Sequence, residues 1–96
     1  MAMKITGFIW LEDIVDKLNR KHSVDVAEVR ELFINGPRYR FVEKGHRKEE
    51  NVYSALGKTD GGRYLICFFV HKKDGRALIV SARDMSQKER KLYERK

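Results

Sequence analysis

The sequence predicts an α+β fold, and three features of its 96 residues support this class. The chain begins with two segments whose apolar residues recur at helical spacing. Four segments with strand-like patterns follow, separated by turns that contain glycine, and a last segment carries a helix-capping pattern. Because the strands follow one another, we expect a mainly antiparallel sheet, with two N-terminal helices on one face and a C-terminal helix. The length suits a single domain over residues 1–96.

The two N-terminal helices are predicted over residues 11–22 and 23–33, after a short candidate strand at residues 3–10. The first helix has one apolar face at the spacing i, i+3, i+4 and i+7, formed by Leu11, Ile14, Val15 and Leu18. Ser23 or Asp25 caps the second helix. Its apolar face consists of Val26, Val29 and Phe33, and it ends before the sequence Asn-Gly-Pro at residues 35–37.

Strands are predicted over residues 38–44, 51–59, 63–72 and 76–82. Residues 64–70 are apolar on both faces, which is typical of a central strand. We therefore expect this strand to lie between strands at residues 52–57 and 77–82. The terminal helix is predicted over residues 86–96, with Ser86 as N-cap and Glu89 three residues later. Its apolar stripe is thin, because only Met85, Leu92 and Tyr93 contribute to it.

The charge is strongly basic, with 21 Lys and Arg against 14 Asp and Glu, a net charge of +7 and a pI of about 9.7. This excess favours a polyanionic partner, such as nucleic acid, an anionic membrane surface or an acidic protein, although it also serves solubility alone. No apolar run reaches the length of a membrane helix, and the opening residues do not resemble a signal peptide. A cytoplasmic protein is expected. The single cysteine, Cys67, lies in an apolar run and is predicted to be an inert core residue.

Several kinds of site are excluded by the residue pattern. His22, His46 and His71 are far apart in basic surroundings, and there is no second thiol, so no metal site is predicted. Gly61 and Gly62 do not precede a helix, which argues against a phosphate-binding loop. Ser81 lacks the small-residue turn of a hydrolase nucleophile. No cofactor is expected.

The cationic segments are more informative. Cations interleaved with Tyr39 and Phe41 can bind phosphates while the aromatic rings stack on bases. The candidate RNA-binding residues are Arg38, Arg40, Arg47, Lys48, Lys88 and Lys91. Cleavage of a phosphodiester without a metal needs a base, an acid and cations that stabilise the phosphorane. The candidates with suitable chemistry are Arg83, Arg76, Glu50, Tyr53 and His46.

Arg83 stands where an apolar strand stops and a helix is about to begin. Its guanidinium is therefore expected to have a defined partner, either phosphate or a carboxylate such as Glu50. Arg76 lies seven residues earlier on the same strand, an odd interval that places two side chains on opposite faces. The two arginines converge only if the strand bulges near Ser81 or ends before Arg83. Most other charged residues are expected to form a solvated surface.

Over nearly its whole length, the sequence resembles the BrnT family of toxins, which are RelE-like ribonucleases of type II toxin–antitoxin pairs. The segments that carry the resemblance are FIW at residues 8–10, KHSV at 21–24, ELF at 31–33, EENVYSALGKTDGGRYLICFFV at 49–70 and GRALIVSARDMSQKERKLYERK at 75–96. Leu11 stands where the family has Asp, and Ser23 where it has Gly. Val52 and Leu78 occupy positions where many members carry Arg.

The resemblance implies a RelE-like fold and a metal-independent endoribonuclease that cleaves RNA. It also implies neutralisation by a cognate, BrnA-like antitoxin protein. Glu50, Tyr53, Arg76 and Arg83 match the family's pattern and would belong to the catalytic site. The alternative is a non-catalytic RNA- or protein-binding module with the same fold.

Overall fold

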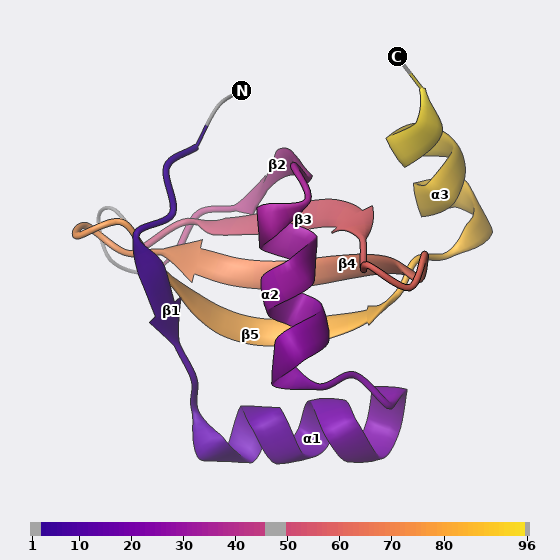
Figure 1. Ribbon diagram of the computed structural model, residues 1–96. Helices are drawn as coiled ribbons and strands as arrows, with labels where there is room; N and C mark the ends of the chain where they lie inside the picture. Colours follow the sequence, from indigo (N-terminus) through magenta and orange to yellow (C-terminus); the bar gives the residue numbers. More distant parts are fainter. Residues whose placement is uncertain (1–2, 46–49, 96) are drawn as a thin grey trace.

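The computed structural model describes residues 3–45 and 50–95. It contains a five-stranded sheet in the order β1-β5-β4-β3-β2 (Figure 1). Only β1 runs parallel to its neighbour, β5, and all other pairs are antiparallel. The predicted α+β class is confirmed. The elements are β1 (Gly7–Ile9), α1 (Glu12–His22), α2 (Val26–Ile34), β2 (Arg38–Glu43), β3 (Val52–Lys58), β4 (Tyr64–His71), β5 (Arg76–Asp84) and α3 (Gln87–Glu94).

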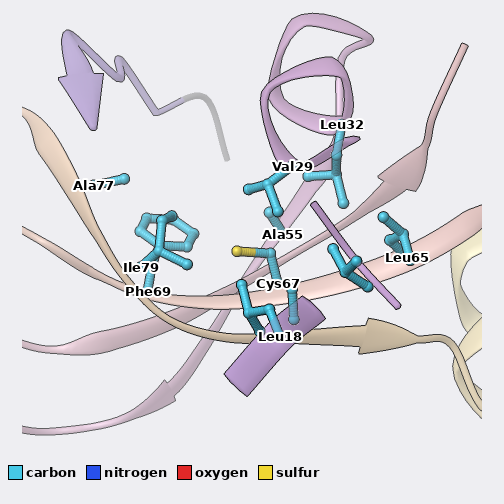
Figure 2. Close-up of a cluster of buried hydrophobic side chains, with 11 residues drawn as sticks. Leu18, Val29, Leu32, Ala55, Leu65, Cys67, Phe69, Ala77 and Ile79 are labelled. Carbon is cyan, nitrogen blue, oxygen red and sulfur yellow. The ribbon is translucent and has the colours of Figure 1, made fainter. Parts of the chain in front are cut away.

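β4 is the central strand, between β3 and β5, as its two-sided apolarity predicted. Helices α1 and α2 cover one face of the sheet and enclose the main core (Figure 2). Leu18 from α1 and Leu32 from α2 are buried there, together with Phe69 from β4. Cys67 is also fully buried, and this burial raises the pKa of its thiol, so the thiol stays protonated and unreactive. This confirms the prediction that Cys67 is a core residue.

A bulge in β5 determines which residues of this strand face the helices. Ile79 pairs with Phe69 and Ser81 pairs with Phe68, so Val80 is an extra residue in the ladder. Because of it, Ile79 and Ala82 both point into the core although their spacing is odd. Ser81 and the following Arg83 point to the opposite face, which we call the outer face.

The capping residues show where α1 ends and α2 begins, which the sequence left open. Asp25, rather than Ser23, caps α2: it accepts a hydrogen bond from the Glu28 backbone N–H, and the Glu28 carboxylate accepts one from the Asp25 N–H. Ser23 ends α1 instead and adopts a left-handed conformation with φ of 51°. The strand expected at residues 3–10 is shorter, covering only Gly7–Ile9.

A glycine at position 23 is expected to stabilise the protein, because a left-handed backbone strains a residue with a Cβ. Ser23→Gly should raise the free energy of unfolding by up to about 1 kcal/mol, which corresponds to a rise of roughly 4–8 °C in Tm for a domain of this size. Thermal unfolding, monitored by circular dichroism, measures this change in Tm. The matched control is Lys17→Gly, at an exposed position inside α1, which should lower Tm by a similar amount. A lower Tm for Ser23→Gly would contradict this explanation.

Candidate nucleic-acid interface

Cations from β2 and α3 face one another across the outer face of the sheet. Arg38 pairs with Leu56 and Arg40 with Ser54 in the β2–β3 ladder, so both arginines lie on the face away from the main core. α3 flanks the same face and presents Lys88, Lys91 and Arg95 toward a hollow of about 450 Å³ that Arg40 also lines. We call the surface formed by these five cations the basic groove.

The floor of the basic groove is apolar and partly aromatic. An adjoining hollow of about 370 Å³ is lined by Leu56, Leu92 and Tyr93 together with both β2 arginines. The guanidinium carbon of Arg38 lies 5.9 Å from the centre of the Tyr93 ring. Cations around an apolar, aromatic floor are suited to a partner that carries both phosphates and flat bases.

Four of the six predicted RNA-binding residues therefore come together in the basic groove: Arg38, Arg40, Lys88 and Lys91. The sequence prediction missed Arg95, which follows α3 and lines the same hollow as Lys88 and Lys91. Its helical spacing from Lys88 and Lys91, seven and four residues, was the available signal. Arg47 and Lys48, and the predicted catalytic residue His46, lie outside the described residues.

Arg83 forms a bidentate ion pair with Glu89 at the edge of the basic groove. Its two terminal nitrogens donate to the two carboxylate oxygens of Glu89 at 2.7 and 2.8 Å. The hydrogen bonds from Arg83 lower the pKa of Glu89 to about 2, so Glu89 is ionised at neutral pH and is a weak base. The pair joins the end of β5 to the first turn of α3. The sequence offered Glu50 as a carboxylate partner, and the structure corrects this to Glu89.

The other predicted catalytic residues lie elsewhere. The bulge at Val80 places Arg76 on the outer face with Arg83, but the two ends of β5 are about 20 Å apart at the usual strand rise. Arg76 pairs with Asp74 at 2.8 Å, and Glu50 pairs with Lys72 at 2.6 Å. Tyr53 faces the main core side, next to Phe69. The structure thus separates Arg83 from the other three described candidates.

Arg63 forms a hydrogen-bond network that sequence reasoning missed. Its guanidinium donates to the carbonyls of His22 and Ser23 and to the carboxylates of Glu28 and Asp84, at 2.7–3.2 Å. These bonds raise the pKa of Arg63 and lower that of the Asp84 carboxyl. Arg63 follows the glycine turn before β4, where the sequence gives no sign of its four partners.

Among residues 3–45 and 50–95, no group of three or more His, Cys, Asp or Glu side chains is arranged to hold a metal ion. In the same residues, no helix has the length and apolarity needed to cross a membrane.

The structure thus defines a small basic α+β protein with two helices on one face of its sheet and a cationic groove on the other. The chain belongs to the BrnT family of ribonuclease toxins of type II toxin–antitoxin systems, because the family profile matches residues 10–89. It is similar to the crystal structure of the Brucella abortus ribonuclease toxin BrnT, with a TM-score of 0.63 and 21% identity over 90% of this chain and 100% of that chain. No curated protein matches the sequence. The resemblance and the fold inferred from the sequence are confirmed.

The Arg83–Glu89 pair is expected to hold α3 in place, since no residue of α3 is fully buried. In a double-mutant cycle of Arg83→Ala and Glu89→Ala, we expect a coupling free energy on the order of 1 kcal/mol after solvent screening of these partly exposed groups. Denaturant unfolding of the four proteins measures this energy. The control cycle is Arg90→Ala with Glu94→Ala, an exposed pair at 3.8 Å, for which about 0.5 kcal/mol or less is expected. Equal coupling in both cycles would contradict a docking role for Arg83.

Proposed function

We propose that this protein is the toxin of a type II pair and acts in the cytoplasm as an endoribonuclease. In this proposal, single-stranded RNA lies in the basic groove and is cleaved without a metal ion. The observation that carries the proposal is the convergence of five cations, from β2, from α3 and from the residue after α3, on two adjoining hollows that share Arg40 and Leu92. Membership of a ribonuclease toxin family supports RNA as the polyanion.

The basic groove offers the two kinds of contact that single-stranded RNA requires. The guanidinium groups of Arg38 and Arg40 can each donate two parallel hydrogen bonds to a phosphate. The ammonium groups of Lys88 and Lys91 add charge from the facing helix. Beside the two arginines, the ring of Tyr93 adds an aromatic surface that a base can contact. Such contacts recognise the sugar-phosphate backbone of RNA more than the identity of its bases.

In this proposal, Arg83 contributes mainly by holding α3 in position. Both of its terminal nitrogens already donate to Glu89, and Arg83 also stacks over the Phe68 ring at 5.6 Å. In this proposal, the ion pair fixes α3 and so sets the spacing between the lysines of α3 and the arginines of β2. That Arg83 also stabilises charge on the scissile phosphate, as inferred from the sequence, stays a prediction.

A non-catalytic binding module is the second candidate. The closed Arg83–Glu89 pair favours it, as do Val52 and Leu78 at positions where the resemblance has arginines. In either case, a cognate antitoxin protein is expected as partner, since the family consists of toxins from toxin–antitoxin pairs. We propose a BrnA-like antitoxin; co-purification with the product of a neighbouring small gene tests this.

Binding of RNA through phosphates should weaken steeply with salt. Each neutralised phosphate contributes a log–log slope of about −0.7 on a single strand. Replacing Arg40 or Lys91 with Ala should reduce the slope by about 0.7, because one phosphate contact is lost. Fluorescence anisotropy with a labelled single-stranded RNA at several salt concentrations measures the slope. Lys17→Ala, at an exposed position of α1, is the matched control and should leave the slope unchanged. A slope that does not respond to the groove variants would rule out this binding surface.

Cleavage by purified wild-type protein should be unaffected by EDTA, since no metal takes part in the proposed reaction. If Arg83 acts by docking α3, Arg83→Ala and Glu89→Ala should reduce RNA affinity and cleavage to similar extents. If Arg83 instead stabilised transition-state charge, Arg83→Ala would cost about 100- to 1000-fold in rate and Glu89→Ala would not. Gel assays on several RNAs, with Tm as a fold control, separate these cases. Tight RNA binding with no cleavage by the wild type would favour the binding module.

A further inference from the structure

A third hollow lies at the other end of the sheet from the basic groove. It has a volume of about 320 Å³ and is lined by Asn51, Tyr53, His71, Lys72 and Lys73. Asn51 immediately precedes β3, Tyr53 lies at its start, His71 ends β4, and the two lysines lie in the turn that follows β4. The volume falls in the range of small-molecule sites and is sufficient for one nucleotide.

His71 is held in this hollow by two independent contacts. Its Nε2 lies 3.1 Å from the backbone carbonyl oxygen of Lys4. Because a carbonyl oxygen can only accept, Nε2 must carry the proton in this hydrogen bond. The imidazole ring also packs edge-on to the Tyr53 ring, with the ring centres 6.4 Å apart. These contacts fix both the tautomer and the orientation of the ring.

The second ring nitrogen, Nδ1, is then the proton acceptor of the neutral imidazole. Within residues 3–45 and 50–95, no donor bonds to Nδ1, whereas two neighbouring cations, Lys72 and Arg76, are held in ion pairs. Lys72 donates to Glu50 at 2.6 Å, and Arg76 donates to Asp74 at 2.8 Å. A fixed imidazole with one unoccupied nitrogen is a suitable general base.

Cations next to His71 suit a phosphate group. Lys73 is exposed in the turn at the rim of the hollow. Lys72 lies beside it, with its ammonium on Glu50. A phosphodiester bound near Lys73 would thus place its ribose close to the imidazole and the Tyr53 ring. This combines a base, a hydroxyl group and a cation, as metal-free cleavage of RNA requires.

We propose that His71 is the general base of RNA cleavage, an inference that rests on the proposed ribonuclease function. Nδ1 of His71 takes the proton of a ribose 2′-hydroxyl, and the 2′-oxygen forms a bond to phosphorus. The bond from phosphorus to the 5′-oxygen breaks, and this oxygen takes a proton from the Tyr53 hydroxyl. The proton on His71 returns to Tyr53 through water. The products are a 2′,3′-cyclic phosphate and a 5′-hydroxyl end.

The basic groove would hold the rest of the RNA chain. β2 pairs with β3 along its length, with Arg40 opposite Ser54 and Glu43 opposite Val52 near the hollow. β2 is the edge strand of the sheet, so a single strand of RNA leaving the groove at Arg40 can pass around this edge to Tyr53. The proposal therefore assigns affinity to one end of the sheet and proton transfer to the other. It excludes a role for Arg83 at the scissile phosphate, because Arg83 and His71 lie near opposite ends of the β4–β5 ladder.

The test uses His71→Gln and His71→Gly in the full chain with a single-stranded RNA oligonucleotide. The glutamine amide can still donate to the Lys4 carbonyl but cannot take a proton, so it tests the base while keeping the contact. Loss of a general base typically lowers the rate by about 100- to 10,000-fold. We expect that loss for both variants, with RNA affinity close to wild type for both and Tm close to wild type for His71→Gln; His71→Gly is expected to be less stable, because glycine weakens a strand and removes both contacts. Added imidazole should partly restore cleavage by His71→Gly, which a merely structural role would not allow. His22→Gln, in α1, is the control and should cleave normally.

Several other outcomes would contradict the proposal. Wild-type cleavage rates for His71→Gln, or no rescue of His71→Gly by imidazole, would overturn the role of His71 while leaving the ribonuclease function intact. No cleavage by the wild type on any RNA would overturn the proposed function itself, and the role of His71 with it. As an independent readout, a single-stranded DNA oligonucleotide, which has no 2′-hydroxyl, should shift the NMR signals of the His71 ring but not those of His22. Unchanged His71 signals would overturn the placement of substrate in this hollow.

Discussion

The guanidinium of Arg63 joins the helical layer to the sheet, and the position of the outer face depends on this connection. Its acceptors come from three places: the end of α1, the first turn of α2 and the end of β5. The carbonyls of His22 and Ser23 are among those that a helix leaves without internal partners at its C-terminal end, where the helix dipole also favours a cation. One cation thus satisfies both carbonyls and two carboxylates. Since Asp84 is held by Arg63, the chain leaves the sheet at a fixed point.

From this point, a second arginine continues the connection on the opposite face. Arg83, next to Asp84, pairs with Glu89, whose carboxylate also accepts the backbone N–H of Ser86. The same side chain therefore caps α3 and binds it to β5. α3 has few apolar contacts, with only Leu92 and Tyr93 half-buried, so polar contacts largely determine its direction. The basic groove exists only while α3 keeps this direction, so the proposed RNA affinity would depend on a chain of ion pairs that begins at Arg63.

Most of the fold could be predicted from local patterns in the sequence. The apolar run of β4 indicated the central strand, Ser86 and Glu89 indicated the cap of α3, and the setting of Cys67 indicated the core. A bulge near Ser81 could be named only as one of two conditions under which Arg76 and Arg83 converge, because the apolar run that ends at Val80 gives no sign of an extra residue. The choice between Ser23 and Asp25 was also open, because both are good caps and only the left-handed backbone at Ser23 separates them.

The candidate site was less predictable, because it depends on contacts between residues far apart in the sequence. Cations of the basic groove could be identified by type, but their convergence requires α3 to fold back over Leu56. The sequence also could not show which carboxylate pairs with Arg83, because Glu50 and Glu89 have the same chemistry. Only the fold pairs Glu50 with Lys72 and Glu89 with Arg83. The role proposed for His71 depends on the Lys4 carbonyl, 67 residues away.

The extra residue in β5 decides which later side chains of this strand face the helices. Side chains alternate along a strand, so Val80 reverses the alternation for every residue after it. If Val80 paired as an ordinary strand residue, Ala82 would turn outward and Arg83 would be directed into the core, where an unpartnered guanidinium is costly to bury. Loss of Val80, by contrast, would leave Ile79 opposite Phe69 and Ser81 opposite Phe68, with every later residue on the same face as before. At this one position, β5 can therefore differ in length by a residue without moving Arg83 away from Glu89.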